Sequence, residues 1–240
     1  MSAARAAAVR AYGWRWTVLP PLTGATMMAM LVGAMLVAPR EAVEGEVQRI
    51  FYIHVPSALA MYFSFTVVFV ASVRVLWWRD MRFDAVARSA AAVGVLFTGL
   101  TLATGAIWGK PIWGVYWTWD ARLTSTLVLF LIFVGYLVVR ALSARTDEQA
   151  ARYAAVFAVI GFLDIPLIHF AVDWWRTLHP QRIVFRADSA LPGEMLLVLL
   201  LGIVAILLLS TWLIALQTDT EVMAARAEAL GAELDRFEGA

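Results

Sequence analysis

Two of the chain's three histidines lie one or two residues before a proline, where the backbone can present an imidazole as a metal ligand. His54 lies in "RIFYIHVPSA", two residues before Pro56, and His179 lies in "DWWRTLHPQR", directly before Pro180. Proline favours the first turn of a helix and disfavours helical backbone in the residue before it, so both histidines are predicted on non-helical backbone. His169 is predicted inside a helix, about one turn from its end.

The stretch "WGVYWTWD" contains three tryptophans, a tyrosine and a carboxylate within eight residues. A short surface helix starting at Pro111 would place positions 113, 116, 117 and 120 on one face. An aromatic shelf of this kind suits a flat apolar macrocycle, because aromatic rings prefer stacked or edge contacts with other π systems. An aromatic belt at the membrane surface is the alternative, but it explains so dense a cluster poorly. The residues expected to form the shelf are Trp113, Gly114, Tyr116, Trp117, Trp119 and Asp120.

The absence of cysteine excludes thiolate ligands, disulfides and covalent haem attachment. A pair of imidazoles then suits haem iron, which takes axial histidine ligands. A zinc site would need a third ligand, which His169 or Asp173 could supply, and that alternative stays open. Arg49 or Arg122 could pair with the propionates of a tetrapyrrole through the guanidinium fork. Arg122 could equally extend to the interface from the start of a helix.

The elements that must position these residues are membrane helices. The chain is 62% hydrophobic and 15% charged, against about 45–50% and about 25% in soluble domains. Roughly 20 apolar residues span a bilayer. Six stretches meet or approach that length, namely 17–38, 56–76, 89–107, 123–139, 153–172 and one starting at Met195. We therefore predict an all-α, polytopic membrane protein with six transmembrane helices in a single domain, residues 1–240, ending in an amphipathic tail over residues 217–240.

The basic residues predict the orientation. Of the 19 lysines and arginines, twelve fall on one side if both termini are cytoplasmic, and seven fall on the other. The outward segments are then 39–55, 108–122 and 173–194, which bring His54, His179 and the tryptophan stretch to one face. Asp164, next to Pro166 in the fifth span, is either a functional intramembrane acid or a partner for backbone groups that the proline leaves free.

Function classes can also be excluded. The sequence shows no nucleophile, acid–base pair or nucleotide site, so we do not expect an enzyme. The basic residues are dispersed, so no nucleic acid partner is expected.

The segment "WGKPIWGVYWTWDARLTS" resembles the tryptophan-rich WWD signature of haem-handling proteins, W-G-x-x-W-x-W-D. "YIHVPSA" and "WWRTLH" are similar to the histidine-bearing outer loops of its CcmC (haem exporter protein C) branch. Tyr116 departs from the pattern, which often has tryptophan there. The resemblance implies non-covalent binding of haem b at the outer face of the bacterial inner membrane, with His54 and His179 as axial ligands. It further implies delivery of haem to the chaperone CcmE, beside the ABC-type subunits CcmA and CcmB and the small membrane protein CcmD.

Two other functions use similar residues. A b-type cytochrome that transfers electrons also uses histidine pairs, although such proteins typically hold both ligands within helices and not in loops. A transporter that moves haem through the helix bundle would need a polar pathway, for which Asp164 is the strongest candidate within the spans.

Overall fold

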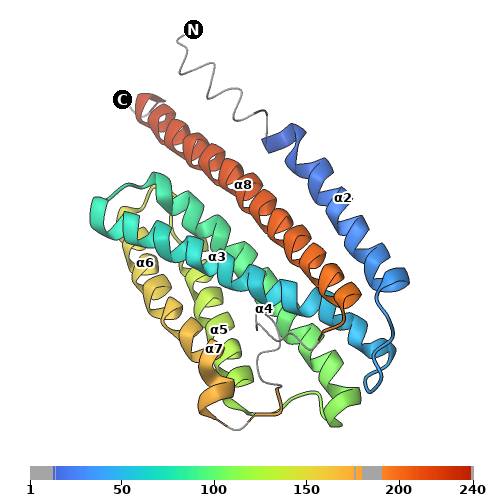
Figure 1. The fold of residues 1–240 in the computed structure, drawn as a ribbon. Coiled ribbons are helices and arrows are strands. Elements are labelled where there is room, and N and C mark those ends of the chain that lie inside the picture. The colour runs from blue at the N-terminus through green and yellow to red at the C-terminus, as the bar shows by residue number, and fades with distance from the viewer. Residues whose placement is uncertain (1–12, 14, 176, 180–190, 239–240) are drawn as a thin grey trace.

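The structure, a computed structural model, describes residue 13 and residues 15–175, 177–179 and 191–238. Within these residues it is helical and contains no β-strand (Figure 1). The main helices are α2 (Leu19–Val32), α3 (Phe51–Trp78), α4 (Arg82–Trp113), α5 (Ala121–Ala141), α6 (Glu148–Phe162), α7 (Asp164–Trp174) and α8 (Gly193–Glu238). A π-helical turn, Gly33–Val37, extends α2, and a 3-10 turn, Glu46–Ile50, leads into α3.

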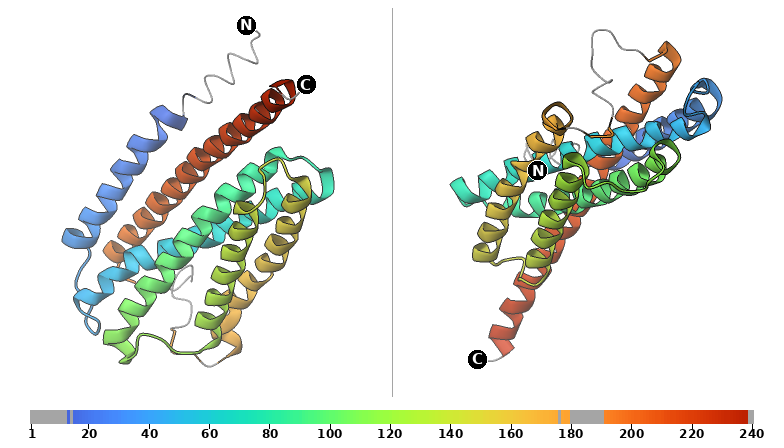
Figure 2. Two further views of the ribbon diagram at one scale, coloured as in Figure 1. Left: turned by 180° about the vertical axis from the view of Figure 1, so that it is seen from behind. Right: turned by 90° about the horizontal axis from the view of Figure 1, so that it is seen from below.

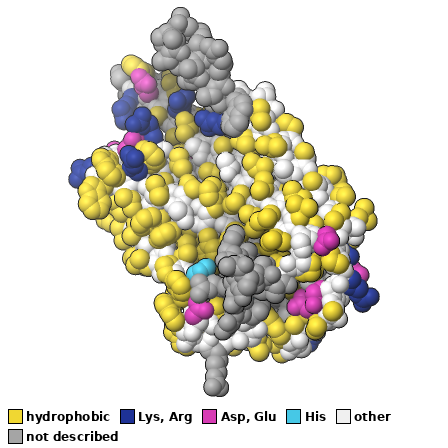
Figure 3. Space-filling model, viewed as in Figure 1, with side chains coloured by type: hydrophobic (Ala, Val, Ile, Leu, Met, Phe, Trp, Pro, Cys, Tyr) yellow, Lys and Arg dark blue, Asp and Glu magenta, His cyan; other side chains and the backbone are white. Residues whose placement is uncertain are grey.

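Six helical segments are long and apolar enough to cross a bilayer. Figure 3 shows hydrophobic side chains over most of one face, with charged side chains mostly toward its ends. The predicted all-α fold with six membrane-spanning helices is therefore confirmed, and the chain is a multi-pass membrane protein. The six segments are Arg15–Val37, Glu46–Trp78, Arg82–Trp113, Ala121–Ala141, Glu148–Trp174 and Gly193–Phe237.

The centre of the bundle depends on close approach of α3 and α4. Ala60 of α3 and Ala90 of α4 are fully buried, and small residues let two helix backbones come together in a membrane. A Cβ on Gly94 would lie 2.5 Å from the ring of Phe65. That ring in turn stacks on Phe133 of α5, with 3.8 Å between ring centroids. The glycine thus allows α3, α4 and α5 to share one aromatic contact.

Two prolines shape the helices that lead to the site. In the fifth span, α6 ends at Phe162 and α7 begins at Asp164, because Pro166 lacks the N–H that would bond to Phe162 and its ring crowds that carbonyl. Pro56 in α3 leaves the carbonyl of Tyr52 without its helical donor in the same way. Gly202 of α8 packs there, where an added Cβ would meet the Tyr52 oxygen at 3.0 Å.

The two ends of the bundle carry different residues. We call one the histidine end, formed by residues 38–54, 104–120, 175 and 177–179, and the other the arginine end, formed by residues 79–88 and 140–147 with the facing part of α8. The start of α2 and the end of α8 lie at the same end of the molecule (Figure 2). With 46 residues, α8 is much longer than the roughly 20 residues that a bilayer requires. The predicted tail over residues 217–240 is, as far as Glu238, the continuation of this helix.

Candidate functional site

The loop that carries His179 packs on both ends of the tryptophan stretch. The imidazole of His179 meets the Trp113 ring edge-on, with 5.2 Å between centroids. Its Nδ1 lies 3.5 Å from Oδ2 of Asp120 and 3.2 Å from Oγ1 of Thr177. The His179 and Asp120 side chains are 14% and 8% exposed, so the contact is largely shielded from solvent. Residues about sixty positions apart in the chain therefore form one cluster.

Asp120 has a structural and an electrostatic role at once. Its Oδ1 accepts the backbone N–H of Leu123 at 2.9 Å and so caps the N-terminus of α5. Its Oδ2 accepts the hydroxyl of Thr177 at 2.9 Å and that of Thr118 at 3.1 Å. Burial opposes ionisation, but these hydrogen bonds hold the pKa of Asp120 below its ordinary value. Asp120 is therefore a carboxylate near neutral pH.

His179 is the uncharged partner in this pair. Burial lowers the pKa of His179 and the nearby Arg122 charge lowers it further, while Asp120 raises it. The net direction is downward, so the imidazole is neutral near pH 7. Only the neutral ring can offer a nitrogen lone pair to a metal.

His54 lies in the first turn of α3, where it faces α4. Its Nδ1 is 3.0 Å from Oγ1 of Thr104, and its ring meets Trp108 edge-on with 5.7 Å between centroids. A Cβ on Gly105 would lie 3.0 Å from Cε1 of the imidazole. Trp108 is itself held by a 3.0 Å hydrogen bond from its Nε1 to Glu44. One face of α4 therefore forms the seat of this histidine.

The predicted non-helical backbone at His54 is wrong, whereas His179 does lie in a bend outside the helices. The helix begins at Phe51 because the 3-10 turn before it already supplies helical geometry, and Pro56 lies inside the helix instead of starting it. Histidine ligands in loops are untypical of b-type cytochromes, and of the two predicted ligands only His179 lies in a loop.

The two histidines contact tryptophans of the same helix. The His54 ring contacts Trp108 and the His179 ring contacts Trp113, five residues further along the last turns of α4. Arg122 extends toward α7, with Nε 3.5 Å from the carbonyl oxygen of Ile168. Both predicted ligands and one of the two predicted propionate partners are therefore brought together at the histidine end.

Arg49, the other predicted propionate partner, has contacts within the connection between α2 and α3. Its Nε lies 2.6 Å from Oε2 of Glu46, and its Nη1 donates to the carbonyl of Ala34. The side chain is 21% exposed. These contacts hold the 3-10 turn against the end of α2.

The aromatic stretch is not helical, which corrects the expectation of a surface helix starting at Pro111. Pro111 lies in the last turn of α4, which ends at Trp113, and Gly114 follows with φ +77°, a left-handed conformation that glycine adopts without strain. Residues 114–120 then run as an irregular connection to α5. Glycine at this position stops the helix before the remaining aromatics can line up on one face.

The aromatics after Gly114 point in different directions. The ammonium of Lys110 lies over the ring of Tyr116, 5.2 Å from its centroid, and Tyr116 is mostly exposed. Trp117 and Trp119 meet edge-on with 5.6 Å between centroids, and Trp119 is 77% exposed. The buried Nε1 of Trp117 has no hydrogen-bond partner among the described residues. The stretch thus offers exposed indole surface and one unpaired indole N–H.

Sequence reasoning missed the side chains that hold the histidines, namely Thr104, Gly105, Trp108 and Thr177. The signal for Thr104 and Trp108, with Gly105 beside Thr104, was their helical spacing in "TGAIWG", once α4 is known to continue to Trp113. Among the described residues, no group of three or more His, Cys, Asp and Glu side chains is arranged to hold a metal ion. The zinc alternative therefore gains no third ligand there. Residues 176 and 180–190 of the predicted outward segment 173–194 lie outside the described residues.

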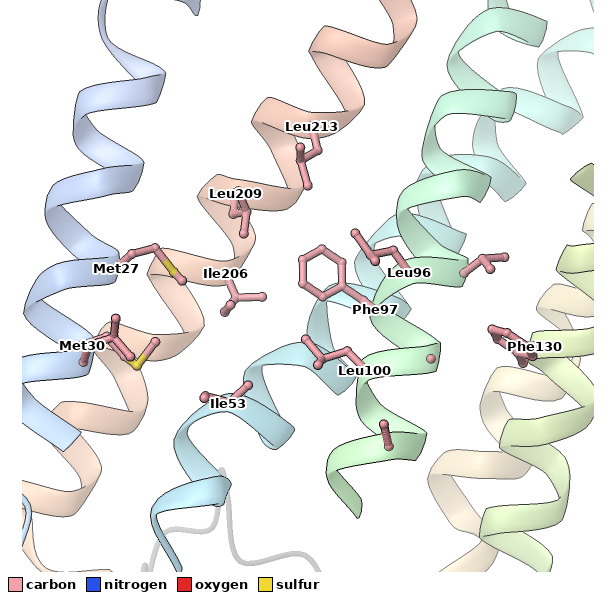
Figure 4. A pocket seen from close by; sticks show the side chains of 14 residues that line it. Met27, Met30, Ile53, Leu96, Phe97, Leu100, Phe130, Ile206, Leu209 and Leu213 are labelled. Carbon is pink, nitrogen blue, oxygen red and sulfur yellow. The ribbon is translucent and has the colours of Figure 1, made fainter. Parts of the chain in front are cut away.

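An apolar groove lies between the α2–α8 pair and α4, with a volume of about 690 Å³ (Figure 4). Its lining includes Ile53 and Ala103, the chain neighbours of His54 and Thr104. Met27, Ile206 and Leu213 belong to the opposite wall. Because this lining is apolar and lies within the spans, we expect lipid acyl chains to fill the groove.

Comparison with known proteins decides the family. The family model described as heme exporter protein C matches residues 2–233. The chain belongs to this family. It is 39% identical over 218 residues to the heme exporter protein C of Bradyrhizobium diazoefficiens, covering 89% of this chain and 82% of that protein.

Similarity extends to enterobacteria and plants. The heme exporter protein C of Escherichia coli K12 is 40% identical over 174 residues, which cover 70% of this chain and 68% of the relative. A putative cytochrome c biosynthesis ccmC-like mitochondrial protein of Marchantia polymorpha is 40% identical over 172 residues, or 72% of each chain. The resemblance identified from the tryptophan stretch and the two histidine segments is thereby confirmed at the level of the family.

Proposed function

We propose that this protein holds haem as cargo at the histidine end, with His54 and His179 as the axial ligands of the iron. The observation that carries the proposal is the convergence of the His179 loop on Trp113 and Asp120, while His54 contacts Trp108 near the same end of α4. The two imidazoles come from α3 and from the connection between α7 and α8, and the tryptophan stretch links α4 to α5. A flat ligand held between them would contact three parts of the chain.

The donor set at this end fits haem. It consists of two imidazoles with no thiolate, and neutral imidazole is a common axial ligand of haem iron. Exposed indole and phenol rings at Trp119 and Tyr116 offer apolar surface to a macrocycle. The unpaired N–H of Trp117 can donate to an acceptor on the ligand. Haem b, bound without a covalent link, satisfies each of these features.

Arg122 is the better of the two predicted propionate partners. It follows Asp120, the partner of His179, by two residues, and the one hydrogen-bond contact of its guanidinium among the described residues is long, 3.5 Å from Nε to the Ile168 carbonyl. Its guanidinium can therefore turn to a carboxylate with little loss. Arg49 is already paired with Glu46 and bonded to the Ala34 carbonyl of the π-helical turn, so its proposed role is to hold the α2–α3 connection.

The family relation supports a place in cytochrome c maturation. The matched relatives are named heme exporter protein C or cytochrome c biosynthesis ccmC-like protein. We propose that this chain acts at the outer face of the bacterial inner membrane, with both termini cytoplasmic, and delivers haem to the chaperone CcmE. CcmA, CcmB and CcmD are its proposed partners. In this role the protein binds and presents its cargo and catalyses no reaction.

The ligand assignment is tested by three variants purified with haem, His54→Ala, His179→Ala and the double variant. Each is compared with His169→Ala, the third histidine, which faces Tyr62 at 6.4 Å between ring centroids. We expect haem absorption to fall in both single variants, to vanish in the double variant and to persist in His169→Ala. Full haem occupancy in the double variant would overturn the ligand pair.

A further inference from the structure

The hydrogen bonds at His54 fix which ring nitrogen carries the proton. Thr104 Oγ1 donates its only hydrogen to a carbonyl of its own helix, that of Leu100 at 2.7 Å. At the imidazole, 3.0 Å away, the same oxygen can therefore only accept. Nδ1 of His54 must then carry the hydrogen, which leaves the lone pair of the ring on Nε2.

The same reasoning applies to His179 through different groups. Thr177 Oγ1 donates its hydrogen to Asp120 Oδ2 at 2.9 Å, so toward the imidazole it can only accept. Both carboxyl oxygens of Asp120 already accept hydrogen bonds, Oδ1 from the N–H of Leu123 and Oδ2 from the hydroxyls of Thr118 and Thr177, so Asp120 acts as an acceptor here as well. Nδ1 of His179 lies 3.2 Å from the first acceptor and 3.5 Å from the second. This nitrogen is therefore also protonated, and Nε2 again has the lone pair.

From these contacts we infer that Thr104 and the pair Thr177–Asp120 are positioning residues, which hold both histidines with Nδ1 protonated and Nε2 ready to bind iron. The inference rests on the proposed function for its ligand, but the protonation pattern it assigns belongs to the haem-free protein. Outer partners of this kind orient a ligating imidazole and raise its basicity.

The two outer partners differ in charge, which makes the two ligands unequal. The hydrogen bond of His54 ends on a neutral hydroxyl, whereas that of His179 ends on a hydroxyl and a carboxylate. A carboxylate draws the Nδ1 hydrogen more strongly and increases the electron density at Nε2. His179 is therefore the stronger donor to iron, and His54 is the ligand that a haem acceptor displaces more easily.

The first test uses the haem-free full-length protein in lipid, labelled with nitrogen-15 at histidine. The imidazole resonances are assigned with His54→Gln and His179→Gln. Both histidines should show a protonated Nδ1 and an unprotonated Nε2. In Thr104→Val the resonances of His54 alone should move toward a mixture of tautomers. A protonated Nε2 at either histidine of the unmodified protein would overturn the inference whether or not haem binds there.

The second test uses the haem-loaded protein. Asp120→Asn keeps the cap on α5, because asparagine is an equally good capping residue, but removes the negative charge beside His179. We expect its bound haem to have a higher midpoint potential, because a weaker donor stabilises the reduced iron. Thr104→Val should lose haem roughly 10- to 100-fold more readily, the usual effect of removing an outer partner. The matched control is Thr98→Val, a buried threonine of the same helix that also donates to its own backbone, at 2.7 Å.

The outcomes separate this inference from the proposed function. If haem depends on both histidines but Thr104→Val and Asp120→Asn behave like Thr98→Val, the positioning roles are wrong and the ligand pair stands. If the His54→Ala, His179→Ala double variant keeps its haem, the proposed function fails. The nitrogen-15 measurement still decides the protonation pattern in that case.

Discussion

At the scale of single residues, the position of His54 depends on the absence of a side chain at Gly105 of α4. Gly105 leaves room for the imidazole, and Thr104 next to it holds Nδ1 by a hydrogen bond. Trp108, one turn further along α4, packs edge-on against the imidazole. The position of Nε2 is therefore set by three neighbouring side-chain positions on one helix.

We expect Gly105→Ala to weaken haem binding about tenfold or more without unfolding the protein. The added Cβ would lie 3.0 Å from Cε1 of His54, so the imidazole must shift by a few tenths of an ångström. Small displacements of this kind degrade a ligand site. Helix stability should not suffer, because alanine is better than glycine within a helix by about 1 kcal/mol. Haem titration of the purified variant, together with its thermal unfolding in detergent, checks both expectations.

The control is Gly99→Ala on the same helix, where the added Cβ would meet only Phe130 at an ordinary 3.6 Å. Equal haem affinity in Gly105→Ala and Gly99→Ala would show that the seat of His54 is not limiting.

At this scale the sequence identified the two histidines, the tryptophan stretch and Asp120, because these residue types are rare in membrane spans. Thr104 could not be recognised in the same way. Threonines in membrane helices usually donate to the carbonyl four residues back, as Thr98 and Thr126 do here. Only the position of α3 beside α4 shows that Thr104 also accepts from an imidazole.

At the scale of elements, the tryptophan stretch is a connection bounded by two helix caps. Gly114 ends α4 in a left-handed conformation, and Asp120 begins α5. Helical spacing predicted a shelf because it continued the helix through Gly114, where the structure ends it. The mistake lies in the helical period assumed for residues 114–120.

The spans themselves were predictable to within a few residues at most ends, since a bilayer demands about 20 apolar residues in a row. The exceptions are the start of α3, both ends of α4 and the C-terminal part of α8, where the helices continue through polar, charged or aromatic residues. A hydropathy pattern shows only where the apolar residues of a span end. Backbone hydrogen bonding ends the helix later, at Gly114 in α4.

The packing of α3 on α4 gives a prediction at this scale. Gly94→Ala should lower the free energy of unfolding by about 1–3 kcal/mol, the usual cost of overfilling a packed core. The added Cβ would lie 2.5 Å from the Phe65 ring, which cannot move away because it stacks on Phe133. Thermal unfolding in detergent measures the loss, and Gly135→Ala provides the comparison, because nothing lies within 4 Å of its added Cβ. A melting temperature for Gly94→Ala at or above that of Gly135→Ala would contradict this account of the packing between α3 and α4.

At the scale of the whole molecule, the arginine end is held by ion pairs that join three helices. Arg140 of α5 pairs with Asp84 of α4 at 2.6 Å, and the two side chains are 1% and 6% exposed. Arg88 of α4 lies 3.4 Å from Glu221 of α8. Glu221 also lies 3.1 Å from Arg145, which follows α5. The pairs fasten the long C-terminal helix to the bundle far from the histidines.

Removing one partner of the buried Asp84–Arg140 pair should lower the stability of the protein without a loss of haem binding. In Asp84→Ala the Arg140 charge stays buried without its partner, which costs about 3–5 kcal/mol in comparable pairs. Changing Arg140 to methionine in the same protein should recover much of the loss, because an apolar pair of similar volume needs no compensation. Asp80→Asn serves as the control. It removes the carboxylate from the Asp80–Arg82 pair, whose atoms are 2.8 Å apart, but there the arginine is 89% exposed and water replaces the partner.

Thermal unfolding of the four proteins in detergent and the haem spectrum of each make the measurement. We expect Asp84→Ala to have a melting temperature well below that of the unmodified protein. Asp80→Asn should have the same melting temperature as the unmodified protein, and both variants should keep the haem absorption band. The double variant should lie between the two. If Asp84→Ala lost haem at full stability, the arginine end would act on the site itself. If the double variant melted no higher than Asp84→Ala, the stranded Arg140 charge would not be the cause. The expected pattern would instead show that the bundle separates its two tasks, with the charges that fix the helices at one end and the imidazoles that hold the cargo at the other.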